Sequence, residues 1–374
     1  MRQMGLSRCA WMFFVFTFGL ITSLGIINSE AVAREDLIEG SRYTSAQNAA
    51  LGDSSFSLGS DMASGLFYNP ANLAKIRKFN FEGLNYSVIG NGGLVNNFGT
   101  NSINIISLNS FASVLNSHPD QRFGAGWSIF PSISLPFLTF GVLVQSEFSG
   151  MSNSNGTITY QTMSQLIPTV GKGFRLLNGL VRFGYSLQYV NEAVGTRTVS
   201  ASSSLNYTAG LAQGSAFSHN FGLSLVAPLP SVPTLSIVVR NAFNTTYSGN
   251  SLFRFSQSPN GVPSTELMTV DAAFAFNTRL APGLVTHWSF AYRDIQDRSD
   301  CRVTMAHVGA GAEIAVKESL FIRFGLRTGY PSAGFGIKKP GTELSLAWYT
   351  EEVGTHYQDQ GDTKFMLQFR TALY

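Results

Sequence analysis

A strict alternation of apolar and polar residues recurs along most of this chain and constrains its fold more than any other feature. It is clearest over residues 181–189, where five apolar residues alternate with arginine, glycine, serine and glutamine. Successive side chains of a β-strand point to opposite faces, so the pattern predicts strands with one apolar and one polar face. The same split recurs at 138–147, 268–276, 287–293, 306–314, 320–327 and 343–348.

Two all-β architectures fit this alternation. One is a soluble antiparallel sandwich with the apolar face inward, and the other is a transmembrane barrel with the apolar face toward lipid. The expected strands are about 9–13 residues long, which suits a tilted membrane crossing better than a globular sheet. Aromatic residues also lie near strand ends, as membrane-interface girdles do: Trp127, Tyr330, Trp348 and Tyr349. We therefore expect a transmembrane antiparallel β-barrel.

Composition supports this choice. Only 13% of the residues are charged, against about 25% in soluble domains, while the chain has 37 glycines and 30 phenylalanines. This composition argues against a soluble enzyme. The formal net charge of +3 gives no reason to expect nucleic acid as a partner.

The first 33 residues resemble a secretory signal peptide. Arg2 and Arg8 precede an apolar stretch at 9–27, and Ala31–Ala33 reads A-V-A, a typical cleavage sequence. An uncleaved membrane anchor is the alternative, because the apolar stretch reaches the length of a short spanning helix. We expect removal of residues 1–33 and export to the outer membrane of a Gram-negative-type bacterium.

Counting strands back from the C-terminus predicts about fourteen. They fall at 102–112, 122–131, 137–148, 157–171, 180–191, 216–227, 233–245, 266–279, 284–294, 304–316, 319–328, 333–338, 342–350 and 363–374. Residues 77–90 also look like a strand, so either 77–90 and 102–112 form one broken strand or one turn is misplaced.

Short and long connections alternate along the chain, as they do in outer-membrane barrels. The short turns are predicted at 131–136, 176–179, 228–233, 281–284, 317–319 and 339–342. The long polar loops are predicted at 149–156, 192–215, 246–265, 294–303, 328–334 and 351–362.

One stretch, residues 61–76, does not alternate. Asn69 is a favoured helix N-cap and Pro70 suits the first helical position, so a short helix is expected after an ordered loop. An ordinary loop-to-helix turn would explain the same residues.

This stretch, LFYNPANLA over residues 66–74, resembles the "YNPAGLA" signature of FadL-type outer-membrane proteins, a family of fatty-acid and aromatic-hydrocarbon transporters with PorV-like relatives. The small-residue segment at 48–57 and the pair Asp61 and Ser64 resemble what precedes the signature in that family. Asn72 stands where the family usually has glycine. The resemblance implies a fourteen-stranded barrel, residues 77–374, with an N-terminal hatch, residues 34–76, inside the lumen. It also implies that Asn69, Pro70 and Ala71 form part of this plug.

Five arginines have the parity of the polar, lumen-facing side: Arg182, Arg240, Arg293, Arg323 and Arg327. Arginine binds carboxylates bidentately, so these side chains are candidate contacts for the head group of a fatty acid. The alternative is that they pair with Asp271, Glu313, Glu343 or hatch carbonyls and hold the plug in place.

Apolar residues in the predicted outer loop 246–265 are candidate contacts for a hydrophobic ligand: Leu252, Phe253 and Phe255. They would equally serve to pack neighbouring loops together.

A catalytic site is the sharpest rival. His287 and Ser289 lie two apart on one strand face, as in outer-membrane lipid hydrolases, where histidine is the base and serine the nucleophile. Their lumen parity and the absence of a following Asn-Gly argue against that role. The remaining histidines show no metal-ligand spacing. We therefore expect no enzyme, no catalytic residue, no metal and no cofactor.

The sequence thus predicts an outer-membrane channel for uptake of hydrophobic molecules, of the long-chain fatty acid or hydrocarbon type. The alternative is a PorV-like scaffold for protein secretion or surface attachment, and a lipid hydrolase ranks below both. The expected partners are the lipid bilayer and a hydrophobic small molecule or, for the scaffold, another protein.

Overall fold

The structure is a computed structural model that describes residues 42–59, 61–96, 108–136, 138–298, 303–354 and 356–373. The expected signal peptide, residues 1–33, lies outside the described residues, as does Tyr374.

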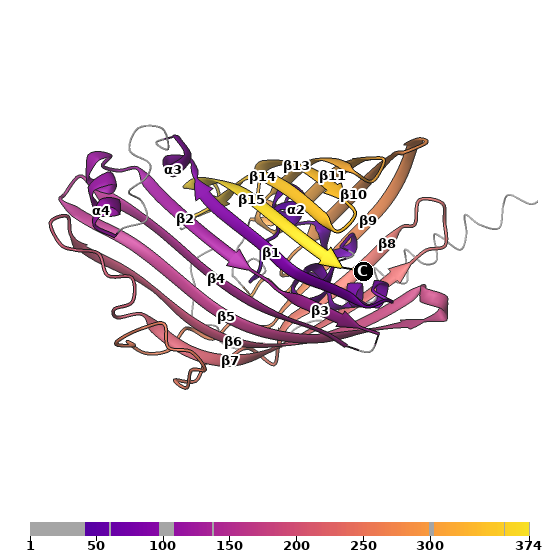
Figure 1. Cartoon of the computed structure of the whole chain (residues 1–374), viewed down its shortest axis with the longest axis horizontal. Helices are drawn as coiled ribbons and strands as arrows, with labels where there is room; N and C mark the ends of the chain where they lie inside the picture. Colours follow the sequence, from indigo (N-terminus) through magenta and orange to yellow (C-terminus); the bar gives the residue numbers. More distant parts are fainter. Residues whose placement is uncertain are drawn as a thin grey trace, which may run out of the picture. The chain divides into compact units, whose positions relative to one another are not determined.

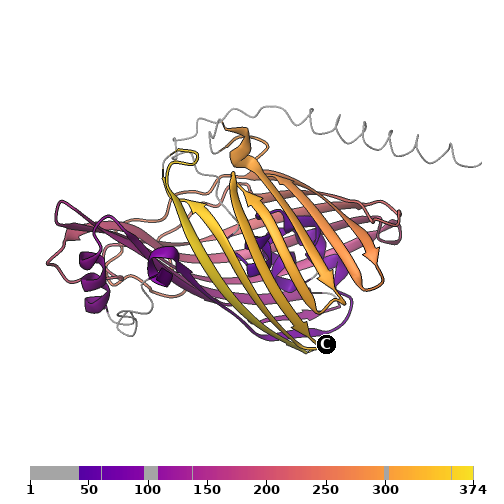
Figure 2. The same ribbon diagram turned by 90° about the horizontal axis from the view of Figure 1, so that it is seen from above.

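The strands form one antiparallel sheet in which the last strand pairs with the first, so the sheet closes into a barrel (Figures 1 and 2). The strands are β1 (Asn80–Asn91), β2 (Arg122–Ile129), β3 (Ser132–Leu135), β4 (Leu138–Asn153), β5 (Thr157–Leu176), β6 (Val181–Ser200), β7 (Ala212–Val226), β8 (Thr234–Ala242), β9 (Thr269–Ala281), β10 (Leu284–Tyr292), β11 (Val308–Val316), β12 (Leu320–Arg327), β13 (Tyr330–Lys339), β14 (Thr342–Glu352) and β15 (Gly361–Leu373). Both β2 and β3 lie between β1 and β4, so they are two halves of one broken strand. Fifteen strands less one give the fourteen that the sequence predicted.

The predicted strand at 102–112 is wrong, and β1 takes its place in the wall. Residues 101–107 lie outside the described residues, and α4 (Leu108–Ser117) is a helix. Phe111 and Leu115, one helical turn apart, are both buried on one side of it.

Four connections also differ from the prediction. The long loop expected at 149–156 is only residues 154–156, because β4 runs to Asn153 and β5 begins at Thr157. The turn expected at 131–136 is mostly β3, which pairs with β1 and β4. The long loop expected at 328–334 is a two-residue turn, in which Thr328 and Gly329 both have positive φ, as a tight hairpin turn requires. Strand β6 continues to Ser200, so the loop expected at 192–215 is shorter than predicted.

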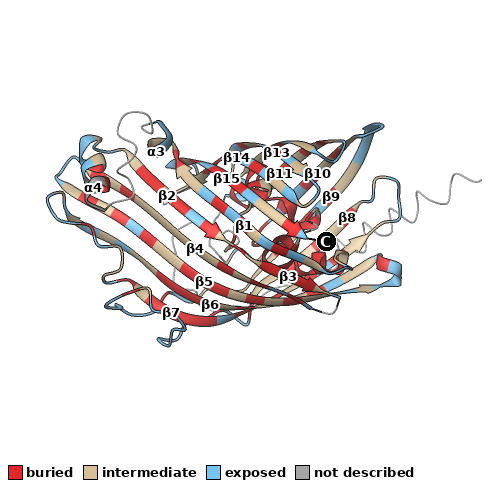
Figure 3. Cartoon of the chain, in the orientation of Figure 1, coloured by how far each residue is buried: buried red, intermediate tan, exposed pale blue. Residues whose placement is uncertain are grey.

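The predicted faces of the strands are confirmed. Phe183, Ile322 and Leu346 are exposed by 38%, 36% and 47%, and so do not meet in a dry core between two sheets. Their polar neighbours point inward: Ser186 and Ser345 are buried. Figure 3 shows this alternation along the strands as buried and exposed bands. The wall therefore has the outward apolar face of a transmembrane barrel.

A bulge in β1 changes the parity of that strand. Relative to both β15 and the β2–β3 strand, β1 carries one extra residue near Gly83. As a result Glu82 and Asn85, three residues apart, both face inward and are buried.

The helical elements fall into two groups. Four short ones precede the wall and lie within the ring of strands (Figures 1 and 2): α2 (Ala46–Ala50), η1 (Ser55–Ser57), η2 (Ser64–Tyr68) and η3 (Pro70–Lys75). The others lie in connections between strands: α3 (Gly92–Asn96), α4, η5 (Leu177–Gly179) and η6 (Thr304–His307). None of the helices in the described ranges has both the length and the apolar character needed to span a membrane.

Candidate functional site

The N-terminal segment, described at 42–59 and 61–76, packs inside the barrel, and we call it the hatch. Nearly all of its residues are buried, and its elements contact β5, β6 and β7 on one side and β13 and β14 on another. Tyr43, Phe67 and Phe130 pack their rings together where the hatch meets the broken β2–β3 strand, with ring centres 5.2–5.7 Å apart. The hatch is therefore an internal plug.

The Asn69–Pro70–Ala71 turn forms the short helix that the sequence predicted, with 3₁₀ geometry. The side chain of Asn69 accepts a hydrogen bond from the backbone N–H of Ala71 at 3.0 Å, and Pro70 is the first residue of η3. Asn69 also donates to the Ser224 hydroxyl of β7 at 3.2 Å. Asn72 is buried and donates to the carbonyl of Phe56 at 2.9 Å, so it links two hatch elements.

Glycines on the lumen side of the wall make room for this turn. A Cβ built on Gly184 of β6 would overlap the carbonyl of Pro70, and one on Gly222 of β7 would overlap the side chain of Asn69. The same holds beneath the end of α2, where Gly325 of β12 contacts Gly52. The hatch backbone thus lies directly on the wall. The sequence analysis did not predict these contacts. A signal for them was present, since these glycines fall on the polar, lumen-facing side of their strands.

Two of the predicted arginines hold the hatch from the loop end of the barrel. Arg240 pairs with Asp271 at 2.6 Å and donates to the carbonyl oxygens of Phe67 and Tyr68 at 2.8 and 3.1 Å. Arg293 forms a buried ion pair with Asp53 of the hatch. Of the two roles considered from the sequence, ligand binding and anchoring of the plug, these contacts correspond to anchoring.

A third predicted arginine, Arg327, also reaches the hatch at the loop end, since it lies 3.5 Å from Asp53 and 3.3 Å from Glu351. The remaining two lie elsewhere on the wall. Arg323 pairs with Glu313 at 2.7 Å on the neighbouring strand. Arg182 lies at the start of β6, at the turn end, apart from the others. Their role as ligand contacts stays a prediction.

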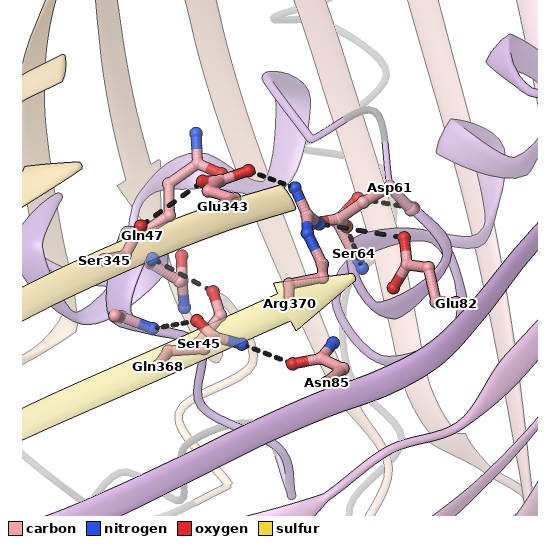
Figure 4. Close-up of polar contacts among 12 residues, drawn as sticks. Ser45, Gln47, Asp61, Ser64, Glu82, Asn85, Glu343, Ser345, Gln368 and Arg370 are labelled. Carbon is pink, nitrogen blue, oxygen red and sulfur yellow. Dashed lines mark hydrogen bonds and ion pairs between the residues drawn. The ribbon is translucent and has the colours of Figure 1, made fainter. Parts of the chain in front are cut away.

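An ion cluster that the sequence did not single out holds the hatch at the turn end (Figure 4). Arg370 of β15 forms ion pairs with Asp61 of the hatch and with Glu343 of β14, and its guanidinium lies 3.8 Å from Glu82 of β1. Burial alone would raise the pKa of Asp61, but Arg370 and hydrogen bonds from Ser64 hold this pKa below its ordinary value. Predicting this cluster requires the β1 bulge, because only the bulge turns Glu82 inward.

A cavity of about 320 Å³ lies toward the loop end of the lumen, between the start of the hatch and the strands β1, β2, β4, β5, β14 and β15. This volume is at the small end of the range for ligand sites. Its lining is mixed: polar residues such as Gln145, Gln165 and Lys364 stand beside apolar ones such as Trp127 and Met163. It is not the apolar pocket that a hydrocarbon channel would lead one to expect.

The charges around this cavity are already paired with one another. Lys364 lies between Glu147 and Glu351, 2.8 Å from the latter. Arg42, at the start of the hatch, pairs with Glu266 and donates to Gln188 at 2.9 Å. A charged ligand would have to replace one of these partners, since a buried unpaired charge is costly.

The three predicted loop residues lie close together but differ in exposure. Leu252 and Phe253 are exposed by 65% and 55%, whereas Phe255 is partly buried, with its ring 4.9 Å from that of Phe253. The carbonyl of Phe253 accepts hydrogen bonds from Asn191 and Gln213 at 2.9 and 2.8 Å. The wall thereby fixes a loop that presents two apolar side chains to the surroundings.

His287 and Ser289 share the lumen side, as their parity predicted, but bond to different groups. The Ser289 hydroxyl lies 2.6 Å from that of Ser54, and His287 Nδ1 lies 2.7 Å from the side-chain oxygen of Asn277. These contacts are those of structural polar residues. Over the described ranges, no group of three histidine, cysteine, aspartate or glutamate side chains could hold a metal.

Comparison with known proteins identifies the fold. No family model matches the chain, and no curated protein matches it. Among solved structures it is similar to the "TodX deltaS2S3 mutant monoaromatic hydrocarbon channel", at 12% identity and a TM-score of 0.51, over 89% of this chain and 98% of that one. It is also similar to the Pseudomonas putida toluene transporter TodX, at 12% identity and a TM-score of 0.50, over 91% and 99% of the chains. A Pseudomonas aeruginosa FadL homologue matches at 11% identity and a TM-score of 0.47, over 91% and 99%. The fold expected from the sequence, a closed antiparallel barrel of fourteen strands, is confirmed.

Proposed function

We propose that this protein is an outer-membrane channel for the uptake of hydrophobic molecules. The observation that carries the proposal is a closed barrel whose own N-terminal segment packs inside the lumen beside a cavity of about 320 Å³ toward the loop end. The chain shares its fold with TodX, which is named as a toluene transporter, and this likeness supports the proposal. We further propose that residues 1–33 are a cleaved signal peptide and that the barrel lies in the outer membrane.

The route begins on the outer loops. Leu252 and Phe253 provide an exposed apolar surface on which a hydrophobic molecule lands. From there it enters the cavity above the hatch, where Lys364 is already paired with Glu147 and Glu351. The hatch must then shift before the molecule proceeds.

The exit is sideways, at the break in the wall between β2 and β3. Phe130 and Pro131 belong to neither half of the broken strand, although single backbone hydrogen bonds of 2.8 and 3.1 Å still join them to the neighbouring strands. The buried ring of Phe130 packs on hatch residues Tyr43 and Phe67, so movement of the hatch would free it. A break in the strand pairing of the wall therefore lies beside the plug.

A cavity-filling substitution tests the proposal. Gln165→Trp would occupy the cavity and should reduce uptake of a radiolabelled fatty acid or hydrocarbon by cells at least tenfold. Gln161→Trp is the matched control, because Gln161 lies on the same strand and parity but is exposed and outside the cavity lining. Equal uptake by the two variants, with equal amounts in the membrane, would contradict a route through the cavity.

The scaffold function remains the alternative, because the exposed apolar side chains of Leu252 and Phe253 would serve a protein partner as well. Mass spectrometry of the detergent-extracted protein separates the two. Fatty acids or hydrocarbons that co-purify support transport, whereas a stoichiometric protein partner supports the scaffold. The lipid hydrolase lacks support, since the described contacts of His287 and Ser289 join each to another residue.

A further inference from the structure

Exposed charges divide unequally between the two ends of the barrel. Ten charged side chains in the described ranges are exposed. At the loop end three are acidic and one is basic: Asp120, Asp297, Asp359 and Arg254. At the turn end one is acidic, Glu318, and five are basic: Arg77, Lys78, Arg279, Lys317 and Lys339. We call these five the basic arc.

The basic arc is continuous along the rim. Arg279, Lys317 and Lys339 belong to three successive hairpins, β9–β10, β11–β12 and β13–β14. Backbone hydrogen bonds join neighbouring turns: Lys317 N–H donates to the carbonyl of Gly283 at 2.6 Å, and Lys338 N–H to that of Ser319 at 2.7 Å.

The arc continues across the closure of the barrel. The N–H of Ala372 near the end of β15 donates to the carbonyl of Gly341 at 2.8 Å, and β15 pairs with β1, which Arg77 and Lys78 precede. All five side chains therefore lie over the stretch of rim that runs from β9 through β15 to β1, and the turns between β4 and β8 contribute none of them.

An apolar band borders the arc on the outside of the wall. Ile337 and Leu344, which pair across β13 and β14, are both exposed, and so are Leu280 and Leu373 at strand ends. Such side chains lie in the hydrocarbon of a bilayer, which places the basic groups at the level of the lipid head groups. Long basic side chains at this depth extend their apolar stems along the acyl region and hold their charges among the head groups.

We propose that the basic arc binds the phosphate groups of anionic phospholipids in the leaflet at the turn end. Each basic side chain near an anionic membrane surface contributes about 1 kcal/mol, which is about a fivefold change in affinity. The arrangement beside the apolar band fits a lipid better than an acidic protein, because the same molecule satisfies both surfaces. The acidic loop end disfavours these lipids, so the binding also fixes the orientation of the barrel. This inference does not depend on what passes through the lumen.

Native mass spectrometry of the full chain in dodecylmaltoside tests the proposal, with dioleoyl phosphatidylglycerol and dioleoyl phosphatidylcholine as probes. The wild type should retain more phosphatidylglycerol than phosphatidylcholine. A variant with Arg77→Gln, Lys78→Gln, Arg279→Gln, Lys317→Gln and Lys339→Gln should lose this preference, with phosphatidylglycerol binding at least tenfold weaker. Glu318→Gln, which removes the one exposed acidic group among the described residues of this rim, should strengthen phosphatidylglycerol binding severalfold.

Two controls make the outcome decisive. Arg254→Gln removes an exposed charge at the loop end and should leave the retention of both lipids unchanged. Heat-dependent migration on a gel reports whether each variant is folded. Equal retention of the two lipids by the wild type would overturn the proposal. So would a folded five-site variant that keeps its full preference for phosphatidylglycerol.

Discussion

The two ends of hatch residues 61–75 meet the barrel wall in different ways. At one end, Pro70 and Ala71 press against Gly184 and Gly222, with backbone against backbone. At the other end, Asp61 is held by the guanidinium of Arg370, which also pairs with Glu343 (Figure 4). Close packing tolerates little displacement, whereas an ion pair can exchange partners. The comparison indicates that, when the hatch moves, its Asp61 end is displaced first and the Asn-Pro-Ala turn acts as the pivot.

Removing the guanidinium should have the largest effect. Arg370→Met would leave the carboxylates of Asp61, Glu82 and Glu343 together without their cation, which typically costs about 3–5 kcal/mol. Hydrogen exchange of the amides at 61–68 should accelerate far more than that at 69–75. Arg254→Met, at an exposed loop position, is the control and should change neither segment. Equal acceleration in both segments would mean that the hatch moves as one body.

A single methyl group should loosen the opposite end. Gly184→Ala forces the Asn-Pro-Ala turn away from β6, at a cost of about 1–3 kcal/mol. Exchange at 69–75 should increase, and the conductance of the reconstituted barrel should rise as the plug loses its fit. Gly249→Ala is the matched control, because the nearest atom to its added Cβ is 3.9 Å away. Unchanged exchange in Gly184→Ala would show that the wall yields instead of the hatch.

Salt should separate the two ends without any mutation. Raising sodium chloride from 0.05 to 1 M shortens the screening length from roughly 14 Å to roughly 3 Å. The Asp61 end should then exchange a few times faster, while the Asn-Pro-Ala end should change less, because glycine packing carries no charge and the guanidinium there, that of Arg175, donates to the carbonyl of Ala74 and not to a carboxylate. A uniform response along the hatch would contradict the division into a charged and a packed end.

Acid should produce the smallest effect. The pKa of Asp61 is lowered in the folded protein, so the carboxylate stabilises the hatch above its ordinary pKa of 3.8, and this contribution is lost as pH falls through the folded value. Exchange at 61–64, corrected for intrinsic rates, should therefore rise in strong acid, as the pH falls through the lowered pKa of Asp61. Asp61→Asn should abolish the acid step, and an acid step that survives in this variant would assign it to another carboxylate.

The sequence was a good guide wherever a single strand or turn decides the outcome. The alternation at 181–189 predicted β6 and the direction of its side chains, because the period of a strand is a local property. Asn69 followed by Pro70 predicted a capped helix for the same reason. The prediction failed at 102–112, where Phe111 and Leu115 fit a helix as well as a strand, and short apolar stretches leave that choice to tertiary packing.

The candidate site was less predictable, since its parts lie far apart in the chain. Five lumen arginines were recognised from parity, yet their partners Asp53, Asp271 and Glu351 depend on which strands are neighbours. Arg370 shared that parity but was not singled out, because its partner Asp61 lies 309 residues away. The lumen-facing glycines were visible in the sequence, but the need for glycine at these positions follows only from the hatch backbone packed against them.

By itself the sequence determined that this chain forms long antiparallel strands with apolar outer faces, and that a capped helical turn precedes them. Those properties follow from the order of neighbouring residues, which fixes local conformation and side-chain direction. Only the tertiary structure decided which segment enters the wall as β1, which glycines receive the hatch, and which carboxylate each arginine meets. It also decided that five exposed cations gather along one part of one rim, because barrel closure brings the end of β15 beside the residues that precede β1.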